Sequence, residues 1–189
     1  MSLIQKRDGI RDFADERIHV EGPRLMIRTL TSEDATEKYV GWLNDPEVNR
    51  FLATKNATMS SVREYINARN EQSNCLFFGI FLRGDHIGTI KLEPIDLKKK
   101  TATIAIMLGD KRTWGHGYGS EALRILIRYG FDALKLHDIN LGVISENHAA
   151  IRSYEKVGFR ETHRTTKSIR YGDNVYDHVT MAVTPSTFI

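Results

Sequence analysis

The chain contains 189 residues, of which 41% are hydrophobic and 27% charged, and its formal net charge at pH 7 is +3. This composition is typical of one globular domain, and the small charge, with no basic tail or half, argues against a nucleic-acid partner. The single cysteine, Cys75, suits a reducing compartment, and there is neither a signal-peptide core nor an apolar run of roughly 18 residues, so we expect a cytoplasmic protein without a membrane partner.

The first half of the chain predicts two helices and then a run of strands. Residues 1–22 are polar and weakly patterned, and we expect them to form an N-terminal extension to one domain over residues 23–189. The expected elements are a strand at 24–30, helices at 35–45 and 62–72, and strands at 75–82, 86–95 and 101–109. Capping-box spacing, Thr31 with Asp34 and Ser61 with Glu64, predicts where the two helices begin. Turn residues between the last three strands predict an antiparallel meander.

The second half predicts a strand–helix–strand unit and a closing hairpin. Apolar residues recur at steps of three and four from Ala122 to Leu134, which predicts a largely buried helix. A short strand at 139–144 follows it and should lie parallel to the strand at 101–109. A helix from Asn147 is expected to end at Gly158, before a hairpin over 160–183. Together these elements predict an α+β domain with a mixed sheet.

Glycines crowd the stretch RTWGHGYGSEA, residues 112–122, directly before the buried helix. The first amides of a helix lack internal partners and carry partial positive charge, so Gly117 and Gly119 would let a phosphate approach them. A tight turn with close helix–sheet packing explains the spacing equally well. A P-loop would need Lys-Ser or Lys-Thr after the last glycine, where this chain has Ser120-Glu121, and a dinucleotide fingerprint would need glycine at Ser120.

A third family fits better. The stretches IAIMLGDKRTWGHGYGSEALRILIRYGFDAL and NHAAIRSYEKVGF resemble the GNAT superfamily of acyl-CoA N-acyltransferases, and WGHGYGSEA is similar to the WGKGYGTEA style of its Rim-type N-acetyltransferase branch. YVGWLNDPEV and HIGTIKL look like the same branch, so the resemblance runs from about Arg24 to the closing hairpin. It implies the GNAT fold, in which a mixed, mostly antiparallel sheet is flanked by helices and splayed around the acyl-CoA site.

The resemblance also implies acetyl-CoA as co-substrate and assigns residues to it. The family signature, Gln or Arg, two residues, Gly, one residue, then Gly or Ala, aligns with Trp114, Gly117 and Gly119. A second register begins at Arg112, and we prefer the first because it puts the glycines at the helix N-terminus. The end of the strand at 101–109 would line the pantetheine arm and polarise the thioester carbonyl. The expected cofactor-binding residues are Ile106, Met107, Leu108, Arg112, Trp114, Gly115, His116, Gly117, Tyr118, Gly119, Ser120 and Asn147.

Two residues of NHAAIRSYEKVGF take functional positions in this resemblance. Tyr154 stands where a tyrosine often acts as general acid towards the departing thiolate, although the position also suits a ring packed on an amphipathic helix. Asn147 stands where the family's asparagine contacts the cofactor arm, and an N-cap role is compatible with that contact.

The chain lacks the carboxylate that often serves as general base in this family. Thr103 stands where family members often carry a carboxylate, and a threonine cannot take that role. Glu93 on the preceding strand is the best candidate, with His86 and Asp177 behind it. Deprotonation through water, without one dedicated base, stays open.

These assignments predict an acetyl-CoA-dependent N-acetyltransferase that acts on a primary amine of a small molecule or amino-sugar by direct attack. The alternatives are an acetyltransferase for protein N-termini and a non-catalytic acyl-CoA-binding module. The acceptor pocket should be built by residues 39–59 and by the hairpin at 168–179. The cysteine and histidines lack ligand spacing, so no metal is expected. Dimers are frequent among similar proteins, so the resemblance is compatible with a homodimer.

Overall fold

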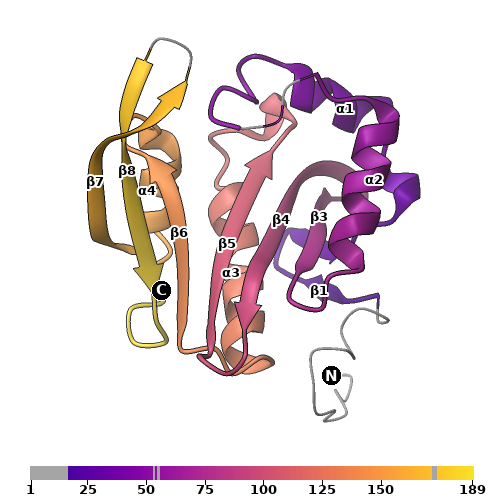
Figure 1. Cartoon of the computed structure of the whole chain (residues 1–189). Helices are drawn as coiled ribbons and strands as arrows, with labels where there is room; N and C mark the ends of the chain where they lie inside the picture. Colours follow the sequence, from indigo (N-terminus) through magenta and orange to yellow (C-terminus); the bar gives the residue numbers. More distant parts are fainter. Residues whose placement is uncertain (1–16, 53, 55, 172–173) are drawn as a thin grey trace.

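The computed structural model describes residues 17–52, 54, 56–171 and 174–189, and within them one mixed sheet carries helices on both faces (Figure 1). The strand order is β1-β2-β3-β4-β5-β6-β8-β7, and every neighbouring pair is antiparallel except β5 with β6. The strands are β1 His19–Glu21, β2 Leu25–Thr29, β3 Leu76–Leu82, β4 Asp85–Asp96, β5 Thr101–Leu108, β6 Asp138–Ile144, β7 Arg160–Tyr171 and β8 Asn174–Val183. The α-helices are α1 Glu37–Asn44, α2 Met59–Asn70, α3 Tyr118–Asp132 and α4 His148–Glu155.

The predicted α+β class, the meander β3–β4–β5 and the closing hairpin β7–β8 are confirmed. One strand appears inside the expected N-terminal extension, since β1 pairs with β2 and forms an edge of the sheet. Residues 1–16 of that extension lie outside the described residues.

The starts of the first two helices differ from the prediction. Asp34 accepts a bond from the Thr31 amide at 2.7 Å, as the spacing predicts, but this box caps a short 3-10 turn, and α1 begins later behind its own cap, Thr36. In α2 the predicted cap Ser61 is the third helical residue and Thr58 is the N-cap. Local spacing identified both turns, but a second residue suited to capping lies near each of them. The N-cap is therefore five residues later than predicted in α1 and three residues earlier in α2.

Two apolar clusters lie on opposite faces of the sheet. The larger packs the sheet against α3 and α4, and the smaller lies beneath α1 and α2 (Figure 1). Phe78 and Ile80 of β3 point into the larger cluster, whereas Phe77 and Phe81 point into the smaller one. Because both faces are covered, β3 is apolar along its whole length instead of alternating.

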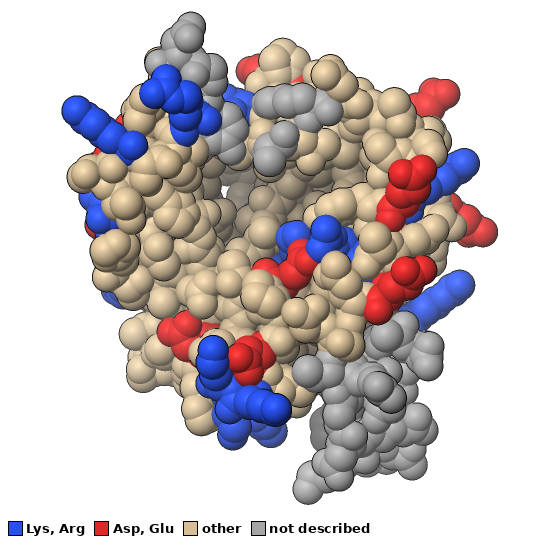
Figure 2. All heavy atoms as spheres, in the orientation of Figure 1, with Lys and Arg blue, Asp and Glu red and all other residues tan. Residues whose placement is uncertain are grey.

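The sheet is splayed between β5 and β6. Only Thr101, Ala102 and Thr103 of β5 pair with β6, in the parallel sense that the sequence predicted. Further along, β5 pairs only with β4, and β6 continues with β8. Figure 2 shows the molecule hollowed between these two halves. An internal strand edge is therefore left open over residues 104–108.

Glu121 fastens the first turn of α3 to the sheet. Its buried carboxylate accepts bonds from the amides of Arg24 and Leu25, at 2.8 and 3.1 Å, and from Nε of Arg24 at 2.7 Å. A carboxylate in the first turn also interacts favourably with the helix dipole. The contact sets the position of the α3 N-terminus relative to β2.

We expect Glu121→Ala to lower the free energy of unfolding by about 3 kcal/mol, because it leaves two amides and a guanidinium without their acceptor. Urea unfolding measures the loss. Glu37→Ala is the matched control, since Glu37 also lies in the first turn of a helix but is exposed, and its cost should stay below about 1 kcal/mol. Equal losses in the two variants would show that Glu121 contributes only through the helix dipole.

Candidate functional site

The glycine stretch forms the entry to α3. Gly117 is the N-cap of the helix with φ of 79°, and Gly115 has φ of 78°. Both values lie in the left-handed region that glycine adopts without steric cost. The first intrahelical bond runs from the Glu121 amide to the Gly117 carbonyl at 3.1 Å, and no side chain of the described residues caps the helix. The preceding amides of the first turn are thus available to an anion.

Gly119 is different from the other two glycines, because neither backbone conformation nor packing requires it. Its φ is not in the left-handed region, and a Cβ built there would meet the Leu108 side chain at an ordinary 3.5 Å. The turn explains why residues 115 and 117 are glycines, since both have positive φ. Neither the turn nor close packing explains Gly119. A glycine at this position keeps the first turn of α3 open to a molecule from outside the chain.

Several side chains surround this turn. Arg24 reaches across from β2, stacks its guanidinium 4.6 Å from the Tyr118 ring centroid and donates to the His116 carbonyl at 3.3 Å. Arg112 is exposed and forms a two-point bond with Asp110, at 3.0 and 2.7 Å, which lowers the pKa of that carboxyl to about 2. Arg24 is therefore a cation held at the helix entry. Sequence reasoning missed it because it lies far away in the chain.

Trp114 links the glycine stretch to the open edge of β5. Its indole N–H donates to the Leu108 carbonyl at 2.9 Å, and its side chain is 40% exposed. The indole therefore occupies the backbone carbonyl at the end of the open edge of β5, in the strand that precedes the glycines.

The backbone of β5 presents alternate residues to the opening. Gly109 donates to the Ile87 carbonyl on the β4 side at 2.9 Å. Because backbone groups alternate sides along a strand, those of Met107 also turn towards β4, while those of Ile106 and Leu108 turn to the open edge. Of the three expected contacts, Ile106 can therefore bond a ligand through its backbone and Leu108 through its amide, since Trp114 occupies the Leu108 carbonyl. Met107 contributes its side chain.

The helix α4 holds the two residues that the second motif singled out. Asn147 is its N-cap and accepts from the Ala150 amide at 3.3 Å. Tyr154 is buried, its ring packs edge-to-face on Phe159 at 5.7 Å, and burial raises its pKa to about 12. The Ser120 hydroxyl donates to the Ser153 carbonyl at 3.3 Å. Ser120 thus fixes α4, next to Tyr154, against the first turn of α3.

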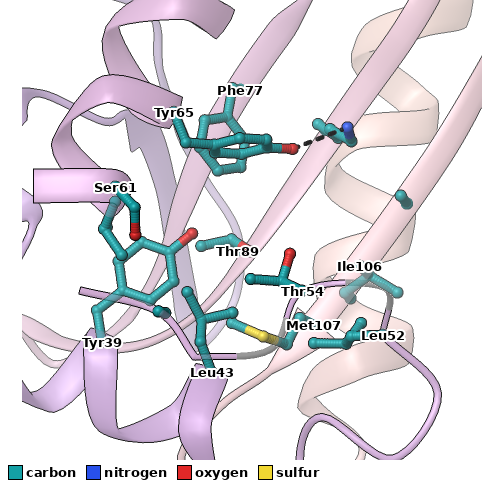
Figure 3. Close-up of a pocket in the computed structure, with 14 residues that line it drawn as sticks. Tyr39, Leu43, Leu52, Thr54, Ser61, Tyr65, Phe77, Thr89, Ile106 and Met107 are labelled. Carbon is teal, nitrogen blue, oxygen red and sulfur yellow. Dashed lines mark hydrogen bonds between the residues drawn. The ribbon is translucent and has the colours of Figure 1, made fainter. Parts of the chain in front are cut away.

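A pocket of about 370 Å³ lies on the face of β5 that α1 and α2 cover (Figure 3). The helices α1 and α2, with Leu52, Thr54 and Ala57 from the segment between them, supply one wall. The floor is supplied by Thr89 and Lys91 of β4 and by Ala105, Ile106 and Met107 of β5. This volume suits a small-molecule site. The first two helices and their loop line it as predicted, but no described residue of the hairpin does.

Glu93 does not line this pocket and is not free to act as a base. Its two carboxylate oxygens are engaged by Arg69 and Lys91 in a pair of ion pairs. Lys91 does line the pocket and donates to the Tyr65 hydroxyl at 3.0 Å. The candidate carboxylate therefore anchors two cations, because Glu93 lies where β4 departs from regular pairing and turns towards α2.

The other two candidates for the general base, His86 and Asp177, also have other contacts. His86 packs among Tyr39, Trp42 and Phe81, and burial lowers its pKa to about 4. Asp177 accepts from the Lys167 amide at 2.9 Å within the hairpin. Neither residue lines the pocket.

Known proteins share both sequence and fold with this chain. Residues 24–160 match the family described as Acetyltransferase (GNAT) domain. A probable N-acetyltransferase, YjcK of Bacillus subtilis, is 35% identical over 175 residues, which are 87% of this chain and 96% of that protein. The chain therefore belongs to the GNAT acetyltransferase family. It is an N-acetyltransferase, and acetyl-CoA is its co-substrate.

Solved structures agree with this membership in fold. A GNAT-family acetyltransferase from Bacillus anthracis has a TM-score of 0.78 at 24% identity, and the match covers 88% of this chain and 98% of that one. The spermidine N-acetyltransferase of Vibrio cholerae, solved with CoA and spermine, has a TM-score of 0.79 at 21% identity, with coverage of 88% and 98%. The predicted splayed GNAT fold is confirmed.

Among the described residues, no helix is long and apolar enough to cross a membrane. The described part of the chain also contains no group of three or more His, Cys, Asp or Glu side chains that could hold a metal ion.

Proposed function

We propose that the protein transfers the acetyl group of acetyl-CoA to a primary amine of a small molecule, amino-sugars included, by direct attack. The observation that carries the proposal is that residues 106–108 border both parts of the site. Leu108 contacts Trp114 and lies beside Gly119, while Ile106 and Met107 line the pocket. A cofactor along this edge would bring its acyl end to the pocket.

The fit to the cofactor rests on three features of the chain. The open amides of α3 and the nearby Arg24 suit a pyrophosphate. The outward-facing backbone of Ile106 and Leu108 suits the amide-bearing pantetheine arm, and an amide there can polarise the thioester carbonyl. Gly115 and His116 would form the turn beneath the phosphates, Tyr118 would hold Arg24 by stacking, and the Asn147 side chain would contact the arm from α4.

The chemistry divides between the chain and the co-substrate. Bound acetyl-CoA supplies a thioester, and as the new nitrogen–carbon bond forms, the carbon–sulfur bond breaks. Tyr154 gives its phenolic proton to the departing thiolate, and burial, which raises the pKa of this phenol to about 12, keeps it protonated over the working pH range.

The amine loses its proton without a dedicated carboxylate. The pocket is largely apolar, and desolvation in it disfavours an ammonium. The proton then passes to water. This replaces the role first considered for Glu93, which the ion pairs with Arg69 and Lys91 hold outside the pocket.

We expect acetyl-CoA at millimolar concentration to raise the melting temperature, and thiol to be released only when a suitable amine is added. The panel should contain phenylethylamine, spermidine, glucosamine and a short peptide with a free N-terminal serine. Turnover of a small amine supports the proposal, and turnover of the peptide alone would make protein N-termini the acceptor. Calorimetric binding of acetyl-CoA without thiol release from any amine would instead support a non-catalytic acyl-CoA-binding module.

A further inference from the structure

We propose that the acceptor is a monoamine with an apolar body and an anionic group, such as a carboxylate, at the end remote from the amine. This rests on the proposed function and defines its substrate class. The inference comes from the charge and shape of the pocket on the α1–α2 side of β5.

The lining of the pocket is mostly apolar, and its charged group lies beside Tyr65. Leu43, Leu52 and Met107 lie at one end, and Tyr65 with Phe77 lies at the other (Figure 3). Thr54, Ser61 and Thr89 add hydroxyls between them. Among the described residues that line the pocket, Lys91 alone carries a charge, and none is acidic. A ligand with an apolar body is therefore favoured over a polyhydroxylated one, because most of the lining offers a ligand hydroxyl no hydrogen-bond partner.

Lys91 can bind an anion because its charge is incompletely balanced. It shares the single carboxylate of Glu93 with Arg69, so the three side chains together carry one net positive charge. Burial lowers the pKa of Lys91, but its bonds to Glu93 and Tyr65 more than offset this and leave that pKa above its ordinary value. An ammonium has three donors, and Glu93 and Tyr65 accept two of them. The third can serve a ligand.

The net positive charge at Lys91 also disfavours polyamines as acceptors. A second ammonium on the acceptor would come close to Lys91, and no carboxylate of the described lining would compensate for it. The family fold alone would not exclude such a ligand, since the Vibrio cholerae neighbour was solved with spermine.

Three para-substituted benzylamines test the proposal, because they differ in one group only. These are 4-(aminomethyl)benzoate, 4-methylbenzylamine and 1,4-bis(aminomethyl)benzene. Calorimetry with protein saturated with coenzyme A measures binding without any reaction. We expect the carboxylate to bind at least about tenfold more tightly than the methyl compound, and the diamine to bind most weakly.

Variants then assign the preference to Lys91. Lys91→Met should abolish the advantage of the carboxylate, Lys91→Arg should restore most of it, and Lys98→Met, an exposed lysine in the turn after β4, should leave it unchanged. Melting temperatures and coenzyme A affinity check that the variants fold. The comparison of the three probes on the wild-type protein tests the proposal even if a variant fails to fold. Equal or tighter binding of the diamine, or no binding of any probe, would overturn the proposal.

Acetylation of the same probes separates this proposal from the proposed function. The expected order of binding without acetyl transfer would contradict the transferase mechanism and leave the recognition intact. Transfer to the diamine in preference to the carboxylate would contradict the recognition and leave the transferase mechanism intact.

Discussion

Replacing Tyr154 with phenylalanine is expected to lower kcat by about two orders of magnitude, because the departing thiolate loses its proton donor. The affinity for acetyl-CoA, measured by calorimetry, should stay within about threefold, since the change removes one hydroxyl from a ring that keeps its packing on Phe159. The melting temperature should also change little. An unchanged kcat would reduce Tyr154 to a packing residue, the alternative that the sequence left open.

The pH profile gives a second check on the same residue. Burial raises the pKa of Tyr154 to about 12. The phenol is the active form and exists below that pKa, so turnover should not fall between about pH 7 and about pH 10 through loss of this proton. Turnover should instead rise with pH over this range as the amine loses its proton. A sharp decline near pH 8 would point to a different acid.

Gly119→Asp is expected to weaken acetyl-CoA binding by about a hundredfold, equivalent to about 2.7 kcal/mol. The new carboxylate would occupy the space that Gly119 leaves open and would repel a phosphate at the α3 N-terminus. In the unliganded protein the same charge lies in the first turn of a helix, where an acidic residue is favourable. Stability should therefore be unchanged or slightly higher.

Gly119→Asn is the matched control, because it has the same shape without the charge, and Gly119→Ala tests the space alone. A Cβ at this position has room, at 3.5 Å from Leu108. We therefore expect Ala to leave stability unchanged but to bind acetyl-CoA less tightly than the wild type, and Asn to lie between Ala and Asp. If all three variants bound acetyl-CoA like the wild type, the glycines would serve only the turn and the packing of α3.

The features that the sequence predicted depend on neighbours in the chain. The apolar period from Ala122 to Leu134 predicted α3, and the register that places Gly117 at its start agrees with the observed N-cap. The capping of α4 by Asn147 and the positive φ of Gly158 were likewise local predictions. The cap of α2 was misplaced from Thr58 to Ser61 because both residues suit a capping box.

The features that only the tertiary structure decided arise between distant elements. Glu93 looked like a candidate base as a strand carboxylate, but Arg69 on α2 neutralises it and turns Lys91 into the charged group of the pocket. Arg24 reaches the glycine turn through Glu121, which lies nearly a hundred positions along the chain. Such contacts leave no periodic pattern, because each depends on the register of two separate strands or helices.

The sequence by itself therefore determined the class of fold, the family and the helix entry with its glycines, since these follow from local spacing and from motifs. The free edge of β5, the pocket beside it and the charge within that pocket depended on where β5 and β6 part and on how α1 and α2 cover the sheet. A pattern of residues fixes what each segment tends to form, but the packing of all segments together decides which polar groups remain available for a ligand.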